Sequence, residues 1–339
     1  MLRLAINGYG RIGRCVLRAL YENGAREQMQ LVAINELAPV QSIDYLTRFD
    51  STHGRFPGDV KQQDGRLIVN GDSIRLLHEA DPSALPWQEL DVDLVLECSG
   101  RFDTRAACEL HIQAGAKKVL LSNPGASDAD MDATVVYGVN HPVVRSEHTI
   151  VSAASCTTNC LVPILDLLDR EWGIEHGSVT TLHSAMNDQP VIDAFHHDDL
   201  RRNRGAGHSI IPVDTGLAKG VARILPQLEG KLESSHLRFP TINVSAMDIV
   251  LRTRSETSLE QVNQLLAKAA AQGPLKGLLG FSNEPLASCD FNHDPRSTIV
   301  DATQTRVNGG RLIKMLAWFD NEWAYASRML DVANLMRKC

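Results

Sequence analysis

The sequence lacks the long apolar runs that membrane-spanning helices require. No stretch of its 339 residues approaches the roughly 20 consecutive apolar residues that cross a bilayer. The first six residues lead directly into a glycine-rich turn, without the apolar core and small-residue cleavage site of a secretory signal. We therefore expect a cytoplasmic protein that does not associate with membranes.

Cysteine pairs in the CxxC spacing are also absent. The seven cysteines form an odd, scattered set. They are Cys15, Cys98, Cys108, Cys156, Cys160, Cys289 and Cys339. This set suggests neither a disulfide framework nor a zinc ribbon, and reduced thiols are the natural interpretation. The run 196–199 (HHDD) could imitate a metal cluster, but adjacent ligands on a loop make a poor closed site, so we expect no metal.

Basic residues are in the minority, with 34 lysines and arginines against 41 acidic residues and a formal net charge of -7. A general nucleic-acid surface would need a basic face, so we expect no nucleic-acid partner. The run 201–204 (RRNR) is the local exception. It is a solvated loop, a subunit contact or a site for an anion.

The chain has the length of two domains and the composition of a globular protein. In the first part, to residue 154, short β-branched runs alternate with helical patterns such as 12–22 and 105–114. This alternation predicts a doubly wound parallel sheet with helices on both faces. The strand candidates are 2–6, 31–35, 93–98, 119–122, 134–136 and 149–152.

From residue 155 to 321 the pattern changes to longer runs with two-residue alternation. Such alternation favours a mainly antiparallel sheet packed on one face against helices, and therefore an α+β domain. The strand candidates are 178–183, 244–251, 297–302 and 311–319. Helices are expected at 217–225 and 258–272, and Ser258 with Gln261 has the form of a capping box. A last amphipathic helix is expected near 322–336.

The strongest local motif is the G-x-G-x-x-G pattern of Gly8, Gly10 and Gly13, between the first strand and the first helix. Gly8 permits a tight turn, Gly10 lets the backbone approach a pyrophosphate, and Gly13 allows close helix–strand packing. The phosphates would face the free amides and the positive dipole end of the helix. This predicts a Rossmann-type dinucleotide-binding domain.

An acidic residue, Glu36, closes the second strand at about the expected distance from the glycine motif. Its carboxylate can accept hydrogen bonds from the ribose hydroxyls of the adenosine. It would also repel a 2′-phosphate, and no arginine follows it in 37–39. NAD is therefore favoured over NADP.

Cys156 follows a turn rich in small and hydroxyl residues and precedes an apolar helical pattern. It is expected at or near a helix N-terminus, where the dipole and free amides stabilise a thiolate. Pro163 implies that this helix is kinked, or that it begins only near Cys160. A thiolate nucleophile needs a base nearby, and His183 closes a strand that could aim it. By chemistry alone, His183 is one candidate among several.

Seven segments carry a family resemblance: 7–14, 155–160 (SCTTNC), His183, 201–212, 212–219, 238–241 (RFPT) and 318–323 (WFDNEW). On these segments the chain resembles the phosphorylating glyceraldehyde-3-phosphate dehydrogenases over essentially its whole length. The resemblance implies an NAD-dependent aldehyde dehydrogenase, with Cys156 as nucleophile and His183 as base. It also implies a homotetramer, with the C-terminal helix 322–339 folded back over the first domain.

The resemblance assigns further roles. Arg11 and Ile12 should contact the pyrophosphate, Ser122 should lie near the dinucleotide, and Asn321 should bond the nicotinamide carboxamide. Ala80 occupies a position usually held by an arginine beside the adenine, so only a backbone contact would remain there. The residues that match substrate and anion contacts are Ser155, Cys156, Thr157, Arg202, Thr215, Gly216 and Arg238.

Segments 183–189, 291–295 and 303–307 are similar to those of family members that oxidise erythrose 4-phosphate. Met186 and Asp188 stand where the family typically has threonines that hold a phosphate; methionine donates no strong hydrogen bond, and an aspartate repels a dianion. The resemblance thus implies oxidation to 4-phosphoerythronate, with water as acceptor, in pyridoxal phosphate synthesis. A glycolytic, phosphorylating enzyme is the alternative. An NAD-sensing protein without turnover is a rival of another class, against which intact Cys156 and His183 speak.

Overall fold

The computed structural model describes residues 1–196 and 199–339. The chain divides into two compact units, one of Met1–Ser155 with Tyr325–Cys339 and the other of Cys156–Ala324. His197 and Asp198, which belong to the run considered above as a metal cluster, lie outside the described residues. Within the described ranges, no helix is both long and apolar enough to span a bilayer.

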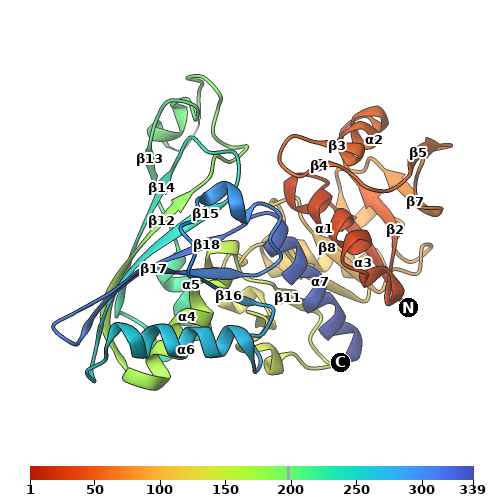
Figure 1. Ribbon diagram of the computed structural model, residues 1–339. Coiled ribbons are helices and arrows are strands. Elements are labelled where there is room, and N and C mark those ends of the chain that lie inside the picture. The colour runs from red at the N-terminus through yellow and green to blue at the C-terminus, as the bar shows by residue number, and fades with distance from the viewer. Residues whose placement is uncertain (197–198) are drawn as a thin grey trace. The chain divides into compact units, whose positions relative to one another are not determined.

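The first unit is built on a nine-stranded sheet (Figure 1). Its order is β10-β11-β9-β8-β1-β2-β7-β6-β5. The strands are β1 (Leu2–Asn7), β2 (Met29–Asn35), β5 (Val60–Gln63), β6 (Arg66–Val69), β7 (Asp72–Leu77), β8 (Leu94–Glu97), β9 (Lys118–Leu121), β10 (Ala133–Thr134) and β11 (Ile150–Ser152). All neighbours from β10 to β7 run parallel, which confirms the predicted doubly wound sheet.

One edge of this sheet differs from the prediction, because β5, β6 and β7 form two antiparallel hairpins. Each hairpin turns at a pair with positive φ, Asp64-Gly65 in the first and Asn70-Gly71 in the second. Asp-Gly and Asn-Gly are the preferred pairs for two-residue hairpin turns. The turn signals were present in the sequence, but the strands around them are short, with four residues in β5 and β6 and six in β7, and β5 is polar after Val60.

The helices of the first unit are α1 (Arg11–Glu22), α2 (Val40–Arg48), α3 (Arg105–Gln113) and most of α7 (Trp323–Lys338), and a small ribbon joins β3 (Phe49–Asp50) to β4 (Gly54–Arg55). α1 connects β1 to β2, and α3 connects β8 to β9, so the two crossovers run in opposite directions along the sheet. Right-handed crossovers then place α1 and α3 on opposite faces. The order reverses between β1 and β8, which opens a crevice at their carboxyl ends.

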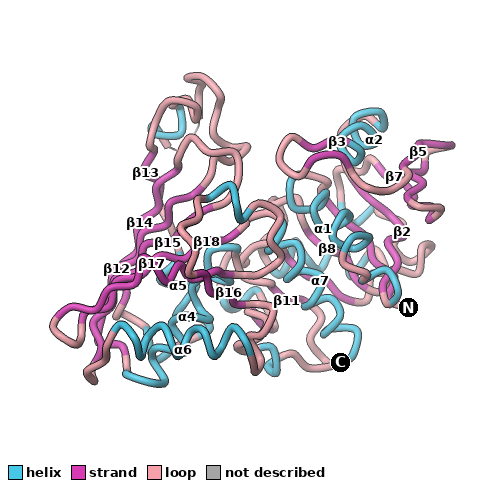
Figure 2. Tube along the Cα trace, in the orientation of Figure 1, coloured by secondary structure: helices cyan, strands magenta, loops and turns pink. Residues whose placement is uncertain are grey.

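The second unit contains a seven-stranded sheet of order β13-β14-β12-β15-β18-β17-β16. The strands are β12 (Ile174–His183), β13 (Ile211–Val213), β14 (Leu232–Arg238), β15 (Ser245–Thr253), β16 (Leu279–Ser282), β17 (Thr298–Asn308) and β18 (Leu312–Phe319). The sheet is mainly antiparallel, as predicted, with parallel pairs at β12–β14 and β16–β17. The segment that links β12 to β13 is mostly loop, with a short helical turn at Leu200–Asn203 (Figure 2).

Three helices cover one face of this sheet: α4 (Cys156–Trp172), α5 (Leu217–Ile224) and α6 (Leu259–Ala271) (Figure 1). The capping box at Ser258 and Gln261 is confirmed, and it starts α6. α4 begins at Cys156 and runs through Pro163, so the alternative start near Cys160 is wrong. Proline removes one backbone hydrogen bond from the helix, and the burial of the surrounding turns holds the helix together in spite of this loss.

Candidate active site

The glycine-rich turn is closed by backbone contacts that only glycine allows. Gly8 has φ +88°, and a Cβ placed on it would lie 2.5 Å from the Ser99 backbone. A Cβ on Gly13 would lie 2.3 Å from the Gly8 carbonyl oxygen. Neither contact is sterically possible, so these two glycines are required by the fold of the protein itself.

Gly10 is different, because nothing in the structure requires a glycine there. It precedes α1 with φ −74°, a value that any residue adopts, and a Cβ on it would meet no atom within 4 Å. The open space lies at the start of α1, where a pyrophosphate binds in dinucleotide folds. This turn therefore fits NAD, since a side chain at position 10 would enter the space that the cofactor needs.

Arg11 and Ile12 form the first turn of α1. The Arg11 guanidinium is paired with Asp50 at 2.5 Å, so this residue offers a pyrophosphate its backbone amide rather than its charge. Burial opposes ionisation of Asp50, but Arg11 and the amides of His53 and Thr52 together outweigh it and hold the pKa of Asp50 below its usual range. Ile12 is half-buried.

Glu36 closes β2 with its carboxylate on the same turn. Its Oε2 accepts the Tyr9 amide at 2.8 Å, and its Oε1 accepts the Ala38 amide at 3.2 Å. A carboxylate has about four acceptor positions, so it can bond these amides and also ribose hydroxyls.

The two remaining candidates in the first unit follow other strands of the same sheet. Ser122 comes directly after β9, and its amide donates to the Glu97 carbonyl. Ala80 lies in the exposed loop after β7, where its methyl group offers no polar contact. The carboxyl ends of β1, β2, β7 and β9 thus gather Gly8–Gly13, Glu36, Ala80 and Ser122 at one edge of the sheet.

A buried acidic residue that the sequence did not reveal supports this edge. Glu97 is fully buried at the end of β8. Its carboxylate accepts Asn7 Nδ2 at 2.6 Å, the Ser99 amide at 2.7 Å and His111 Nε2 at 3.1 Å. Ser99 is the residue against which Gly8 packs, so Glu97 fixes the wall of the glycine-rich turn. No spacing rule marks such a residue in a sequence.

In the second unit, a thiol and an imidazole meet at the start of α4. Cys156 Sγ lies 3.8 Å from His183 Nε2. His183 Nδ1 is 2.9 Å from the Ser184 carbonyl oxygen, which can only accept, so Nδ1 carries the proton and Nε2 faces the sulfur as a base. His183 is the last residue of β12 and is 3% exposed.

Burial controls the charge of this pair. It raises the pKa of the Cys156 thiol to about 12, against the opposing effect of the Thr157 and Cys156 amides. Burial also lowers the pKa of His183. The amides at the helix start favour the thiolate, but the effect of burial is larger. Because the partners are adjacent, thiolate and imidazolium can form together, each as the counterion of the other.

Asn321 lies in the second unit and contacts Ser184, the residue after His183. Its Oδ1 accepts the Ser184 hydroxyl at 3.0 Å and the Ser245 hydroxyl at 2.9 Å, which identifies its Nδ2 as the donor for a ligand. Ser245 Oγ also accepts the Ser184 amide at 3.1 Å. The preceding residue, Val244, has φ +63°, an unfavourable value for a β-branched residue. Strain of this kind persists where the surroundings require one geometry.

The two candidate anion-binding arginines are bridged by an acidic residue. Asp188 Oδ2 is 2.9 Å from Arg238 Nη2 and 3.3 Å from Arg202 Nη1. Burial opposes ionisation of Asp188, but both arginines hold its pKa below the usual range. The expectation that Asp188 simply repels a phosphate is therefore incomplete, because its charge is already neutralised. Arg238 Nη1 donates to Gln189 Oε1 at 2.9 Å, and Met186 Sδ lies 3.8 Å from Nη2, the atom that Asp188 also contacts.

The other predicted substrate contacts lie at helix starts. Ser155 directly precedes α4, and Thr157 is buried in its first turn. Thr215 accepts the Leu217 amide through its hydroxyl at 3.2 Å, and Gly216 is the residue before α5.

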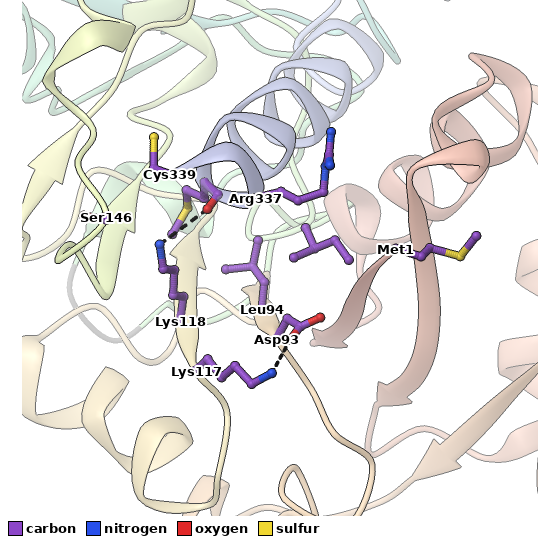
Figure 3. Close-up of a pocket in the computed structure, with 10 residues that line it drawn as sticks. Met1, Asp93, Leu94, Lys117, Lys118, Ser146, Arg337 and Cys339 are labelled. Carbon is purple, nitrogen blue, oxygen red and sulfur yellow. Dashed lines mark hydrogen bonds and ion pairs between the residues drawn. The ribbon is translucent and has the colours of Figure 1, made fainter.

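A pocket of about 410 Å³ lies at the opposite edge of the first sheet, beside the amino ends of β1, β8 and β9 (Figure 3). Lys117 points to Asp93, and Lys118 points to the last turns of α7, where it donates to the Met336 carbonyl (Figure 3). These lysines of the pocket thus bond within the protein. The pocket lies at the edge of the sheet away from the glycine-rich turn. Its lining consists of Met1, Leu2, Asp93, Leu94, Lys117, Lys118, Ser146, Met336, Arg337 and Cys339.

A turn that fits NAD, and a half-buried thiol beside a buried imidazole, are what an NAD-dependent enzyme that oxidises aldehydes requires. The model of the glyceraldehyde 3-phosphate dehydrogenase NAD-binding domain matches residues 2–105, and that of its C-terminal domain matches 155–321. The chain therefore belongs to the glyceraldehyde 3-phosphate dehydrogenase family. It is an NAD-dependent, aldehyde-oxidising oxidoreductase.

The open space at Gly10 generates the first prediction. Gly10→Ala should raise the Kd for NAD at least about tenfold, because the methyl group enters the pyrophosphate space. The melting temperature should stay the same or rise slightly, since the methyl group meets no protein atom. Gly13→Ala is the matched variant and should lower the melting temperature as well. Wild-type NAD affinity in Gly10→Ala would remove Gly10 from the cofactor site.

The coupled charges of Cys156 and His183 lead to the second prediction. His183→Asn removes the counterion, so the rate of Cys156 alkylation by iodoacetamide at pH 7 should fall at least about tenfold. The rate should then rise only at strongly alkaline pH, because burial alone raises the thiol pKa. His176→Asn, an exposed position on the same strand, is the control. Equal alkylation rates in the two variants would show that the thiolate does not depend on His183.

Proposed function

We propose that the protein oxidises D-erythrose 4-phosphate to 4-phosphoerythronate, as an erythrose-4-phosphate dehydrogenase with water as acceptor. Cys156 is the nucleophile and His183 the base. The observation that carries the proposal is the surroundings of Arg238, where Met186 and Asp188 contact the guanidinium. These contacts disfavour a phosphate held in the family's usual way.

The chemistry begins with proton transfer from Cys156 Sγ to His183 Nε2, which lies 3.8 Å away. The thiolate adds to the aldehyde carbon and forms a thiohemiacetal. The backbone amide of Cys156 and the protonated His183 can stabilise its oxyanion. His183 gives its proton to this oxyanion, which becomes a hydroxyl group, and then takes the proton back as the carbonyl of the thioester forms. NAD supplies the acceptor for the hydride that leaves the same carbon.

The proposal assigns the NAD contacts to the following residues. Gly8, Gly10 and Gly13, with the amides of Arg11 and Ile12, hold the pyrophosphate, and Glu36 bonds the adenosine ribose. Asn321 Nδ2 donates to the nicotinamide carboxamide, and the fixed Oδ1 contacts to Ser184 and Ser245 support this orientation. Ser122 and the Ala80 backbone complete the set.

Substrate phosphate is held by Arg238 and Arg202, with the hydroxyls of Thr157 and Thr215, the Gly216 amide and Ser155 around it. Arg202 also pairs with Asp199 at 3.5 Å, so the two guanidinium groups have two carboxylate partners and the cluster is close to neutral. A four-carbon aldehyde places its phosphate farther from the thioester than a three-carbon one does. The phosphate then occupies space that inorganic phosphate would need for attack, and water resolves the thioester.

The product, 4-phosphoerythronate, places the reaction in pyridoxal 5′-phosphate biosynthesis, in the cytoplasm. We expect the homotetramer that the family resemblance implies. The alternative function is a phosphorylating glyceraldehyde-3-phosphate dehydrogenase of glycolysis. The paired arginines favour that alternative, since displacement of Asp188 would free both for an anion.

The third prediction compares substrates and acceptors on the wild-type enzyme. The kcat/KM for erythrose 4-phosphate should exceed that for glyceraldehyde 3-phosphate, measured as NADH formation. Turnover should persist in phosphate-free buffer, with an acid as product identified by mass spectrometry. Cys156→Ser is the control, since an alcohol at neutral pH is a far weaker nucleophile than a thiolate. Strict dependence on added phosphate, with an accumulating acyl phosphate, would restore the glycolytic function.

A further inference from the structure

A second imidazole lies beside the base. His236, on β14, stacks on His183 with ring centroids 5.0 Å apart and planes 21° apart. In the parallel register of β12 and β14, Thr181 is opposite His236, and His183 is opposite Arg238. Side chains opposite each other in a parallel pair point to the same face. The four side chains therefore share one face of the sheet, and α5 packs on β14 from the helical layer.

Polar atoms in this group are buried without a partner. In the part of the chain that the structure describes, Thr181 Oγ1, His236 Nε2 and Arg238 Nε form no hydrogen bond. Thr181 and Arg238 are 0% and 5% exposed. Unpaired buried polar atoms are costly and rare in folded proteins, so a group of them marks a place that a ligand or water completes.

The charge of His236 indicates what kind of ligand group it can meet. Burial, with the neighbouring His183, Arg238 and Arg202, lowers its pKa to about 3, and only Asp188 opposes the shift. The imidazole is thus neutral at pH 7 and offers one donor and one acceptor. A neutral ring suits a hydroxyl group, while the arginines beside it suit the phosphate.

We propose that His236 is a specificity-determining residue whose Nε2 forms a hydrogen bond with a hydroxyl group of the bound sugar phosphate. Its position supports this, because it contacts the base at the aldehyde end and precedes Arg238, at the phosphate end, by two residues on one strand. The hydroxyl groups of the substrate lie between those ends. The inference rests on the proposed function only for the substrate class, a hydroxylated aldehyde phosphate.

The experiment compares erythrose 4-phosphate with 4-oxobutyl phosphate, which has the same chain and phosphate but no other hydroxyl group. His236→Phe keeps a ring to stack on His183 and removes Nε2. The ratio of the two kcat/KM values should fall about tenfold, the factor that one hydrogen bond provides. An unchanged ratio of the two kcat/KM values overturns the proposal. If both values fall equally, His236 supports the structure or binds a water instead.

Two further variants keep the test decisive. His236→Gln restores a donor and an acceptor without the ring, so it should retain a higher ratio than His236→Phe; equal ratios overturn the hydrogen bond. Ser235→Ala, exposed on the other face of β14, should match the wild type. If the wild type prefers glyceraldehyde 3-phosphate, the proposed function fails. The same loss in His236→Phe, measured for that substrate against 3-oxopropyl phosphate, would still support the role of His236.

Discussion

The burial of Cys156 and His183 is the constraint on which the chemistry of the second unit depends. A single charge in that environment is expensive, and an adjacent opposite charge compensates it. The thiolate is therefore available only together with the imidazolium. This requirement explains why His183 closes a central strand and why the Ser184 carbonyl fixes its tautomer. It also explains the position of Cys156 at the first residue of α4, where amides and the dipole add to the stabilisation.

The same physics arranges the charges around the substrate phosphate. Arg238 is 5% exposed, and an unpaired guanidinium there would be costly without a ligand. Asp188 and Gln189 pair with its two Nη atoms. In the proposed function, a substrate phosphate must share or replace the carboxylate, which makes binding an exchange of anions. Such an exchange favours a phosphate that is tethered to an already bound aldehyde over free phosphate, because the tether raises its local concentration.

The sequence predicted the features that depend on local geometry. The strand–glycine–helix motif of Gly8 to Gly13, the helix that starts at Cys156 and the capping box at Ser258 each lie within a few residues of one another, so their spacing alone indicates the structure. The hairpins of β5 to β7 had local turn signals at 64–65 and 70–71 as well, but buried apolar residues alternate over only two positions in each of β6 and β7, which is a weak strand signal.

The features that escaped prediction depend on strand register between distant segments. Glu97 meets His111 and Asn7 only after β1 and β8 pair, and Asp188 meets Arg202 and Arg238 only after the chain returns through β14. β14 itself was not predicted, because polar residues occupy most of its positions on both faces and no row of apolar residues marks one face. β14 can therefore be recognised as a strand only from its pairing with β12 and β13.

The proposed catalytic and specificity-determining residues lie on two neighbouring strands of this sheet, β12 and β14. In our proposal, β12 ends in the base, while β14, paired with it in parallel, carries an anion-binding arginine and an imidazole two residues earlier. A shift of one residue in this register would turn His236 and Arg238 to the other face together. On the same proposal, a side-chain change at 236 or 186 alters what the site accepts, because neither position holds the thiol or fixes the tautomer of the base. Substrate selectivity can thus change while Cys156 and His183 stay the same. The register of β12 and β14 keeps His183 aligned with His236 and Arg238.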